Sequence, residues 1–298
     1  MNSRAGTLAA ISAIVLWSAG NLIVRDAPME GVQIAFWRVS LGAVSYWLFL
    51  VMSGRRLTLS QLKASAPAGA AIALELAVFF VAIKSTTVAN ATVIAALQPL
   101  VVIAIGIKRF GEHVTRTLIV VSAIAITGVI LVVFGSSAQA IWSPRGDVLA
   151  VVAMLLFAAY FIFAKHARAA VPAFEFQTGL WVVGAVVLLP VAVFDAGGLV
   201  FPTSTQWVWL VALLLVPGTG HFVMNWAHGS VSLSLTSLLN LGTPVLSTLG
   251  AFVFLNEDLG PVQIVGVVIV IAALAIVVTR ESRNSIIDRL AAEEVVDL

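Results

Sequence analysis

The chain has 298 residues, of which 61% are hydrophobic and 10% are charged, and its formal net charge is +2. Soluble domains carry about 25% charged residues, so this composition excludes a water-soluble globular fold and makes lipid the solvent. The chain has no cysteine, which excludes disulfides and thiolate chemistry. Its basic residues are spread between apolar runs, so no nucleic-acid partner is expected.

Ten apolar runs are long enough to cross a bilayer core of roughly 30 Å at about 1.5 Å per residue. The first follows Arg4 and lacks the cleavage site of a secretory signal, so we expect a retained membrane helix. Segments rich in charge, Gly, Pro and Ser separate the runs, and very short links at 84–88 and 228–231 predict tight hairpins. The expected spans are 7–24, 32–53, 66–83, 88–107, 116–134, 147–164, 175–194, 206–226, 231–255 and 260–279. The fold class is therefore all-α integral membrane.

Lysine and arginine predict the orientation of these spans. With the N-terminus inside, twelve of the basic residues fall on the cytoplasmic side and three on the other. The positive-inside rule then places both termini in the cytoplasm. Residues 281–298 form a charged tail that we interpret as a short solvated or interfacial helix rather than a regulatory segment.

The sequence repeats itself. Pro99 and Pro244 lie 145 residues apart, as do Glu112 and Glu257, at the ends of QPLVVIAIGIKRFGE and TPVLSTLGAFVFLNE. GTLAAISAIVLWSAGNLIVR also matches GDVLAVVAMLLFAAYFIFAK at an offset of 140. These matches predict two five-helix repeats, residues 1–140 and 141–280. Because five is odd, the second repeat is inverted, which is an architecture of secondary transporters.

These features resemble the drug/metabolite transporter superfamily, and specifically its EamA-type exporters. The strings IVLWSAGNLIVR, LELAVF, AAYFIFAKHAR and TPVLST are similar to YddG-type aromatic amino acid exporters. Gln98 departs from that pattern, because an aromatic residue is expected before Pro99. The resemblance implies a multi-pass protein of the bacterial inner (cytoplasmic) membrane that exports amino acids and related metabolites.

Glu75 is the most informative polar residue, because it lies mid-span in AIALELAVFF. A carboxylate at that depth costs about 2.5 to 3.5 kcal/mol on insertion scales unless it is paired or protonated. It is a candidate substrate-ammonium site or proton site; the alternative is a carboxyl that only bonds a neighbouring helix. Phe79, one turn away, is a candidate apolar wall.

Proline residues in two matching spans indicate interrupted helices. Pro99 and Pro244 each remove a backbone hydrogen bond and are expected to kink their helices. Such interruptions in matching halves mark transporter sites. Gln98 and Asn240, beside these kinks, are candidate cavity residues; the alternative is that they only cap a mechanical kink.

Two further pairs complete the candidate cavity. Trp17 and Phe157 occupy equivalent positions and are expected to line opposite walls, with ordinary packing as the alternative. His221 and Asn225 share a helical face and are candidates for cavity lining or a proton relay, with a bonded interior pair as the alternative. Arg38 is interpreted as structural.

No phosphate loop, metal-protease motif or catalytic trio with supporting context is present, so we expect neither an enzyme nor a cofactor or metal. The expected function is export of neutral amino acids, including aromatic ones, by alternating access through a central cavity. The alternative is export of cationic or amphipathic drugs or metabolites. Ten helices can form a complete unit in one chain, so a monomer in the lipid bilayer would suffice.

Overall fold

The structure, a computed structural model of the whole chain, describes residues 3–85, 88–112, 114–135, 143–255 and 258–296. Within these ranges every regular element is helical. The elements are α1 (Ser3–Asp26), α2 (Gly31–Met52), α3 (Leu59–Ser85), α4 (Val88–Ala95), α5 (Gln98–Phe110), α6 (Arg116–Phe134), α7 (Pro144–Arg168), α8 (Ala173–Ala196), α9 (Ser204–Leu213), the π-helical η1 (Leu214–Gly218), α10 (Thr219–Ala227), α11 (Leu233–Leu239), α12 (Gly242–Leu255) and α13 (Pro261–Val296).

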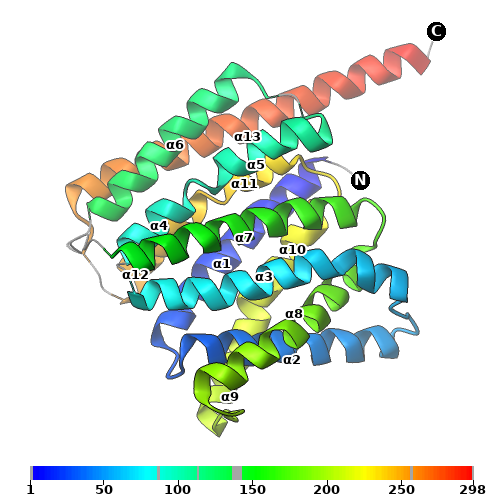
Figure 1. Cartoon of the computed structure of the whole chain (residues 1–298). Helices are drawn as coiled ribbons and strands as arrows, with labels where there is room; N and C mark the ends of the chain where they lie inside the picture. The colour runs from blue at the N-terminus through cyan, green and yellow to red at the C-terminus, as the bar shows by residue number, and fades with distance from the viewer. Residues whose placement is uncertain (1–2, 86–87, 113, 136–142, 256–257, 297–298) are drawn as a thin grey trace.

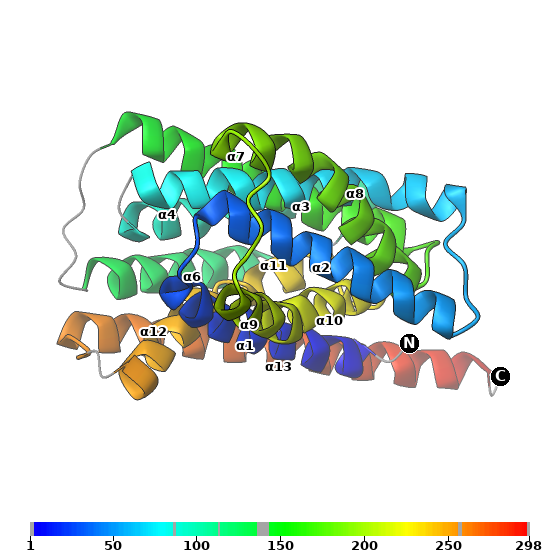
Figure 2. The ribbon, with the colours of Figure 1, turned by 90° about the horizontal axis from the view of Figure 1, so that it is seen from below.

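Ten helical segments are long and apolar enough to cross a membrane, which confirms the all-α membrane fold and the number of spans. Because ten crossings return the chain to its starting side, both termini lie at one end of the bundle (Figures 1 and 2). We call this the terminal end, and the other the distal end. The α2–α3, α5–α6, α7–α8 and α10–α11 connections lie at the terminal end.

Helices that are distant in sequence pack side by side. α3 packs against α7 and α8, α2 packs against α8, and α1 packs against α10 and α12. α6 and α13 form another pair at the edge of the bundle (Figure 1). The segments that we expected to be two repeats are therefore interleaved, and their contact surfaces meet in the interior.

Two spans are interrupted beside their prolines, as expected. The span expected at 88–107 separates into α4 and α5, and the span expected at 231–255 separates into α11 and α12. Pro99 lies in the first turn of α5, and Pro244 lies in the first turn of α12. The first turn of a helix does not need the N–H that proline lacks, so each proline begins a new helical segment after the break. Glu257, the second glutamate of the repeat, lies outside the described residues.

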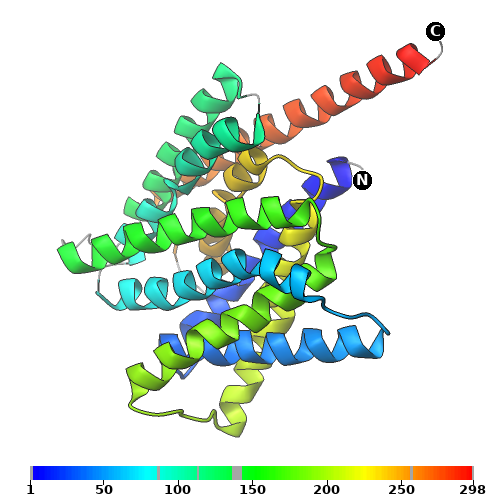
Figure 3. The same cartoon turned by 45° about the vertical axis from the view of Figure 1, so that its right-hand side comes forward.

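The last helix is longer than a membrane crossing requires. α13 continues as one helix to Val296, so the tail extends the final span and projects past the neighbouring helices at the terminal end (Figure 3). A polar stretch that continues a membrane helix without a break is consistent with a helix that leaves the bilayer at that end.

Glycines allow α6 and α13 to touch through their backbones. A Cβ at Gly266 would lie 2.6 Å from the carbonyl oxygen of Gly128 and 2.7 Å from the backbone nitrogen of Val132. Small residues at such contacts let membrane helices approach closely.

We expect Gly266→Ala to lower the stability of the protein by roughly 1–3 kcal/mol, the usual cost of overpacking. The midpoint of thermal unfolding in detergent measures the effect. Gly198→Ala is the matched control, because a Cβ there meets nothing within 4 Å. Equal midpoints for the two variants would contradict the close contact.

The predicted orientation can be tested at the two ends of α8. The chain has no cysteine, so Ala170→Cys and Gly198→Cys would each carry a single thiol. We expect a membrane-impermeant maleimide to label Gly198→Cys in intact cells and Ala170→Cys only after permeabilisation, because the basic loops are expected inside. The reverse pattern would place the termini outside.

Candidate functional site

Polar side chains from five helices gather in the interior of the bundle. Each is at least nine-tenths buried, although the surrounding solvent is lipid. The group comprises Arg38 on α2, Glu75 on α3, Tyr160 on α7, Gln177 on α8, and His221 and Asn225 on α10. Polar groups at membrane depth must face the protein interior, and such groups mark functional sites by default. We call these six residues the central cluster.

One half of the central cluster is held by hydrogen bonds between side chains. The hydroxyl of Tyr160 donates to Oδ1 of Asn225 over 2.9 Å. Nδ2 of Asn225 donates to Oε1 of Gln177 over 2.8 Å. These two bonds join α7, α10 and α8, and they leave Nε2 of Gln177 without a partner.

The other half of the central cluster is charged. Arg38 and Glu75 interact electrostatically, and the field of Arg38 also reaches His221. Glu75 in turn interacts with Tyr160, so the charged and hydrogen-bonded halves are continuous. Nε and Nη2 of Arg38 are buried and have no hydrogen-bond partner.

Aromatic rings surround His221. The ring centroid of Trp17 lies 4.9 Å from that of His221, and the ring centroid of Trp181 lies 5.4 Å away. Nε1 of each tryptophan and Nδ1 of His221 are buried without a partner. Such groups need an explanation, because an unmade hydrogen bond in the interior costs about 1–3 kcal/mol.

Trp17 and Phe157 do come together, but they do not face each other across an open space. Their centroids lie 6.0 Å apart with the rings inclined at 61°, and Phe161 joins them 5.0 Å from Phe157. The expectation of opposite walls is therefore wrong. The two residues form one edge-to-face cluster, a favourable geometry for aromatic pairs.

The remaining predicted residues are not among the contacts of the central cluster named above. Phe79 packs against a separate small group that contains Ala82, Ala91 and Ala150. Gln98 is 1% exposed at the start of α5, and both atoms of its amide lack a partner. Asn240 lies at the α11–α12 break, where its Oδ1 accepts a hydrogen bond from Oγ1 of Thr243 over 3.1 Å.

Glu112 ties two spans together at the terminal end. Its carboxylate accepts hydrogen bonds from the backbone N–H of Leu233 over 2.5 Å and of Ser234 over 2.9 Å. The hydroxyl of Ser234 adds a third bond over 2.5 Å. The carboxylate thus caps the N-terminus of α11, where the helix dipole favours negative charge.

Other polar links close the same end. Arg55 and Glu175 form an ion pair of 2.7 Å that joins the α2–α3 loop to α8. Lys165 donates to the carbonyl oxygens of His228 and Val231, which joins α7 to the α10–α11 loop. Burial, with the positive charges of Lys165 and Arg168, lowers the pKa of His228 to about 3, so its ring is neutral at pH 7.

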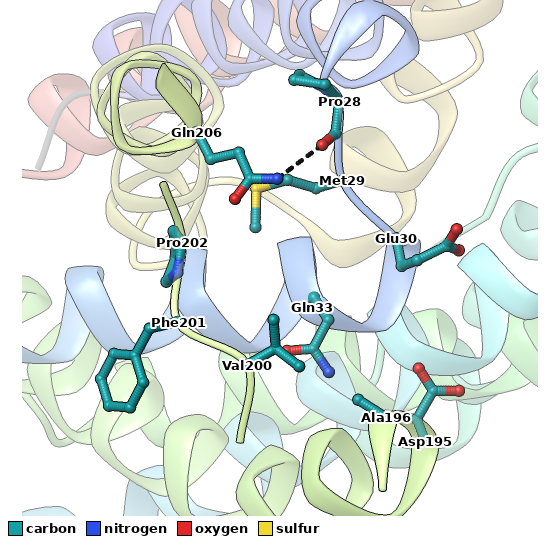
Figure 4. A pocket seen from close by; sticks show the side chains of 10 residues that line it. All are labelled: Pro28, Met29, Glu30, Gln33, Asp195, Ala196, Val200, Phe201, Pro202 and Gln206. Atoms are coloured by element: carbon teal, nitrogen blue, oxygen red, sulfur yellow. Dashed lines mark hydrogen bonds between the residues drawn. The ribbon is translucent and has the colours of Figure 1, made fainter. Parts of the chain in front are cut away.

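The distal end has a hollow of about 420 Å³ between the start of α2 and the end of α8. Figure 4 shows the carboxylates of Glu30 and Asp195 on one side of it, with Gln33 beside them. Oε1 of Gln33 is buried and has no partner, whereas its Nε2 donates to the carbonyl of Ala192 over 3.0 Å. The hollow therefore combines two carboxylates with a mostly apolar lining that includes Met29, Val200 and Phe201.

Sequence analysis missed two members of the central cluster, Tyr160 and Gln177, and also Trp181 beside it. It interpreted Arg38 as structural. Gln177 lies in the first turns of α8, where the sequence suggests an ordinary helix start. Tyr160 carried a usable signal, since it is one of two tyrosines in the chain. Trp181 resembled any apolar residue of a span, and only packing shows its indole N–H beside α10.

Comparison with known proteins identifies the class of protein. The model of the EamA-like transporter family matches residues 4–134 and 144–279. The chain belongs to this family, which makes it a multi-pass membrane transporter rather than an enzyme.

Individual relatives are distant but match over nearly the whole chain. A pseudopaline exporter, CntI, from Pseudomonas aeruginosa strain UCBPP-PA14 is 23% identical, covering 93% of this chain and 98% of its own. An uncharacterized transporter from Archaeoglobus fulgidus is 23% identical over 92% and 96% of the two chains. A crystal structure of a protein with 18% sequence identity matches with a TM-score of 0.80, covering 93% of this chain and 98% of that one, which supports the fold.

The cap on α11 can be tested by removing the Glu112 carboxylate. We expect Glu112→Ala to destabilise the protein by about 1–2 kcal/mol, because two first-turn N–H groups lose their acceptor. Thermal unfolding in detergent measures the loss. Asp258→Ala, which removes an exposed carboxylate, is the control; a midpoint for Glu112→Ala equal to that of the control would show that the cap contributes nothing.

Proposed function

We propose that this transporter exports neutral amino acids, including aromatic ones, and related metabolites from the cytoplasm. The observation that carries the proposal is the arrangement of the central cluster. A buried carboxylate, Glu75, and a buried guanidinium, Arg38, interact beside a group of aromatic rings. An amino acid presents an ammonium, a carboxylate and a side chain, and this arrangement offers a complementary group for each.

In this proposal Glu75 holds the ammonium of the substrate or exchanges a proton with it. Its charge is balanced by Arg38 when the site is empty. Trp17 and Phe157 provide apolar surface for the side chain of the substrate, and His221 lies between Trp17 and Trp181. Gln98 adds an unpartnered amide at the start of α5.

The difference between the two ends supports the proposal of alternating access. The terminal end is held by the Glu112 cap and by the Arg55–Glu175 ion pair, whereas the distal end carries the hollow. We propose that the terminal end is cytoplasmic and closed in this state. Release of the Glu112 cap would remove one of the contacts that hold the α10–α11 region, and the breaks at α4–α5 and α11–α12 would let the two repeats rock against each other.

One relative supports export as the direction of transport. CntI, which matches over 93% of this chain and 98% of its own, is named as a pseudopaline exporter, and this name supports export by this chain as well.

Cationic or amphipathic compounds are the second candidate substrates, and the distal hollow is the observation that favours them. The side chains of Glu30 and Asp195 line it and carry two carboxylates (Figure 4). A surface of this kind attracts cations, and it would attract the ammonium of an amino acid equally. The two candidates are therefore separated by transport measurements.

The test uses purified protein in liposomes with labelled phenylalanine, labelled leucine and a fluorescent cationic dye, with and without a pH gradient. We expect both amino acids to cross and the dye to remain. We expect Glu75→Gln to reduce amino acid flux at least tenfold, because the ammonium loses its counter-charge, and to remove any effect of the pH gradient. Asp258→Asn is the matched control.

Movement of the dye without amino acids would support the second candidate. Unchanged phenylalanine flux in Glu75→Gln would remove the proposed role of this carboxylate. A well-folded wild-type protein that moves none of the three compounds would overturn amino acid export.

A further inference from the structure

Arg38 differs from the other buried or half-buried arginines of the chain. Arg168 donates to the carbonyl oxygens of Asn225 and Val171, and Arg55 pairs with Glu175. These contacts tie each guanidinium to the protein. Nε and Nη2 of Arg38 have no hydrogen-bond partner, although the residue is only 6% exposed.

The two unpartnered atoms form one edge of the guanidinium. On that edge the N–H groups of Nε and Nη2 point in parallel, which is the geometry that binds both oxygens of a carboxylate. Glu75 balances the charge of Arg38 electrostatically but does not occupy this edge. Burial of charged donors without hydrogen bonds is costly. The unused Nε and Nη2 of Arg38 therefore indicate a site for a binding partner.

Other unpartnered donors lie in the same region. Nε1 of Trp17 and Nε1 of Trp181 are buried without acceptors, and both indole rings lie next to His221. Trp181 also packs against α2 one turn from Arg38, since a Cβ at Gly42 would lie 3.1 Å from Cδ1 and 3.3 Å from Nε1 of the indole. A region with this surplus of donors is complementary to a ligand that supplies acceptors.

We propose that Arg38 binds the carboxylate of the transported substrate through Nε and Nη2, opposite an ammonium held by Glu75. This inference rests on the proposed function and narrows it: the substrate is a zwitterion that carries both groups. The Arg38–Glu75 pair has no net charge, so it suits a zwitterion better than a phosphate ester, whose two negative charges would face Glu75 without compensation. Arg38 is then a specificity residue rather than a structural one.

The experiment measures binding to purified protein in detergent with three probes: phenylalanine, phenylalaninamide and phenethylamine. The last two keep the amine and the ring but lack the carboxylate. For the wild type we expect phenylalanine to bind at least tenfold more tightly than either analogue. A tenfold ratio corresponds to about 1.4 kcal/mol, which is less than the usual cost of breaking a buried charge pair.

The variants separate the effect of the two parallel N–H groups of Arg38 from the effect of its positive charge. We expect Arg38→Gln to weaken phenylalanine binding at least tenfold, while binding of phenylalaninamide changes less than about threefold. Arg38→Lys keeps the positive charge but lacks the two parallel N–H groups, so we expect its loss of phenylalanine affinity to be intermediate. Arg116→Gln, the same change at an exposed residue, is the control.

Three outcomes would overturn the inference: equal wild-type affinity for phenylalanine and its amide, equal losses for both probes in Arg38→Gln, or unchanged affinity in Arg38→Lys and Arg38→Gln. If Arg38→Gln does not fold, the wild type and Arg38→Lys decide the question. Failure of the proposed function is distinct, because then wild-type proteoliposomes move no amino acid; amino acid flux without carboxylate selectivity would remove only the role of Arg38.

Discussion

The absence of water from the bilayer core is the constraint on which the rest of this structure depends. A polar group that faces lipid cannot find a hydrogen-bond partner, so all such groups must turn inward. In this chain six of the inward-facing groups meet in the central cluster, because α3 packs against both α7 and α8, and α8 also contacts α2 and α10. The same constraint that builds the fold therefore also concentrates the chemistry.

The central cluster is incompletely satisfied, and the pattern is informative. Tyr160, Asn225 and Gln177 form a continuous set of hydrogen bonds that holds three helices. Around Arg38 and His221, by contrast, buried donors remain unused. A purely structural interior would remove these groups or pair them, since each unmade bond lowers stability. We infer that they are retained for a transported molecule.

The two ends of the bundle differ, and the proposed alternating access rests on this difference. Glu112 fixes the start of α11 at the terminal end, and Arg55 and Glu175 join two further helices there. At the distal end, Glu30 and Asp195 lie on one side of a hollow of about 420 Å³. A carboxylate that caps a helix across an interface can be released without unfolding either helix, because the bonds it makes lie at the helix terminus rather than within the helix.

The sequence by itself determined the ten spans, because the apolar length needed to cross a bilayer leaves little freedom. It also located Glu75, Trp17 and His221 as candidates, because polar or aromatic residues in apolar runs are conspicuous. Only the tertiary structure decided which of them meet. It placed Phe79 in a different group, joined Trp17 to Phe157, and brought Tyr160 and Gln177 to Asn225. Periodicity fixes which residues share a face of one helix, but the packing of helices distant in sequence fixes which faces meet, and so whether a donor such as Arg38 is paired or left for a ligand.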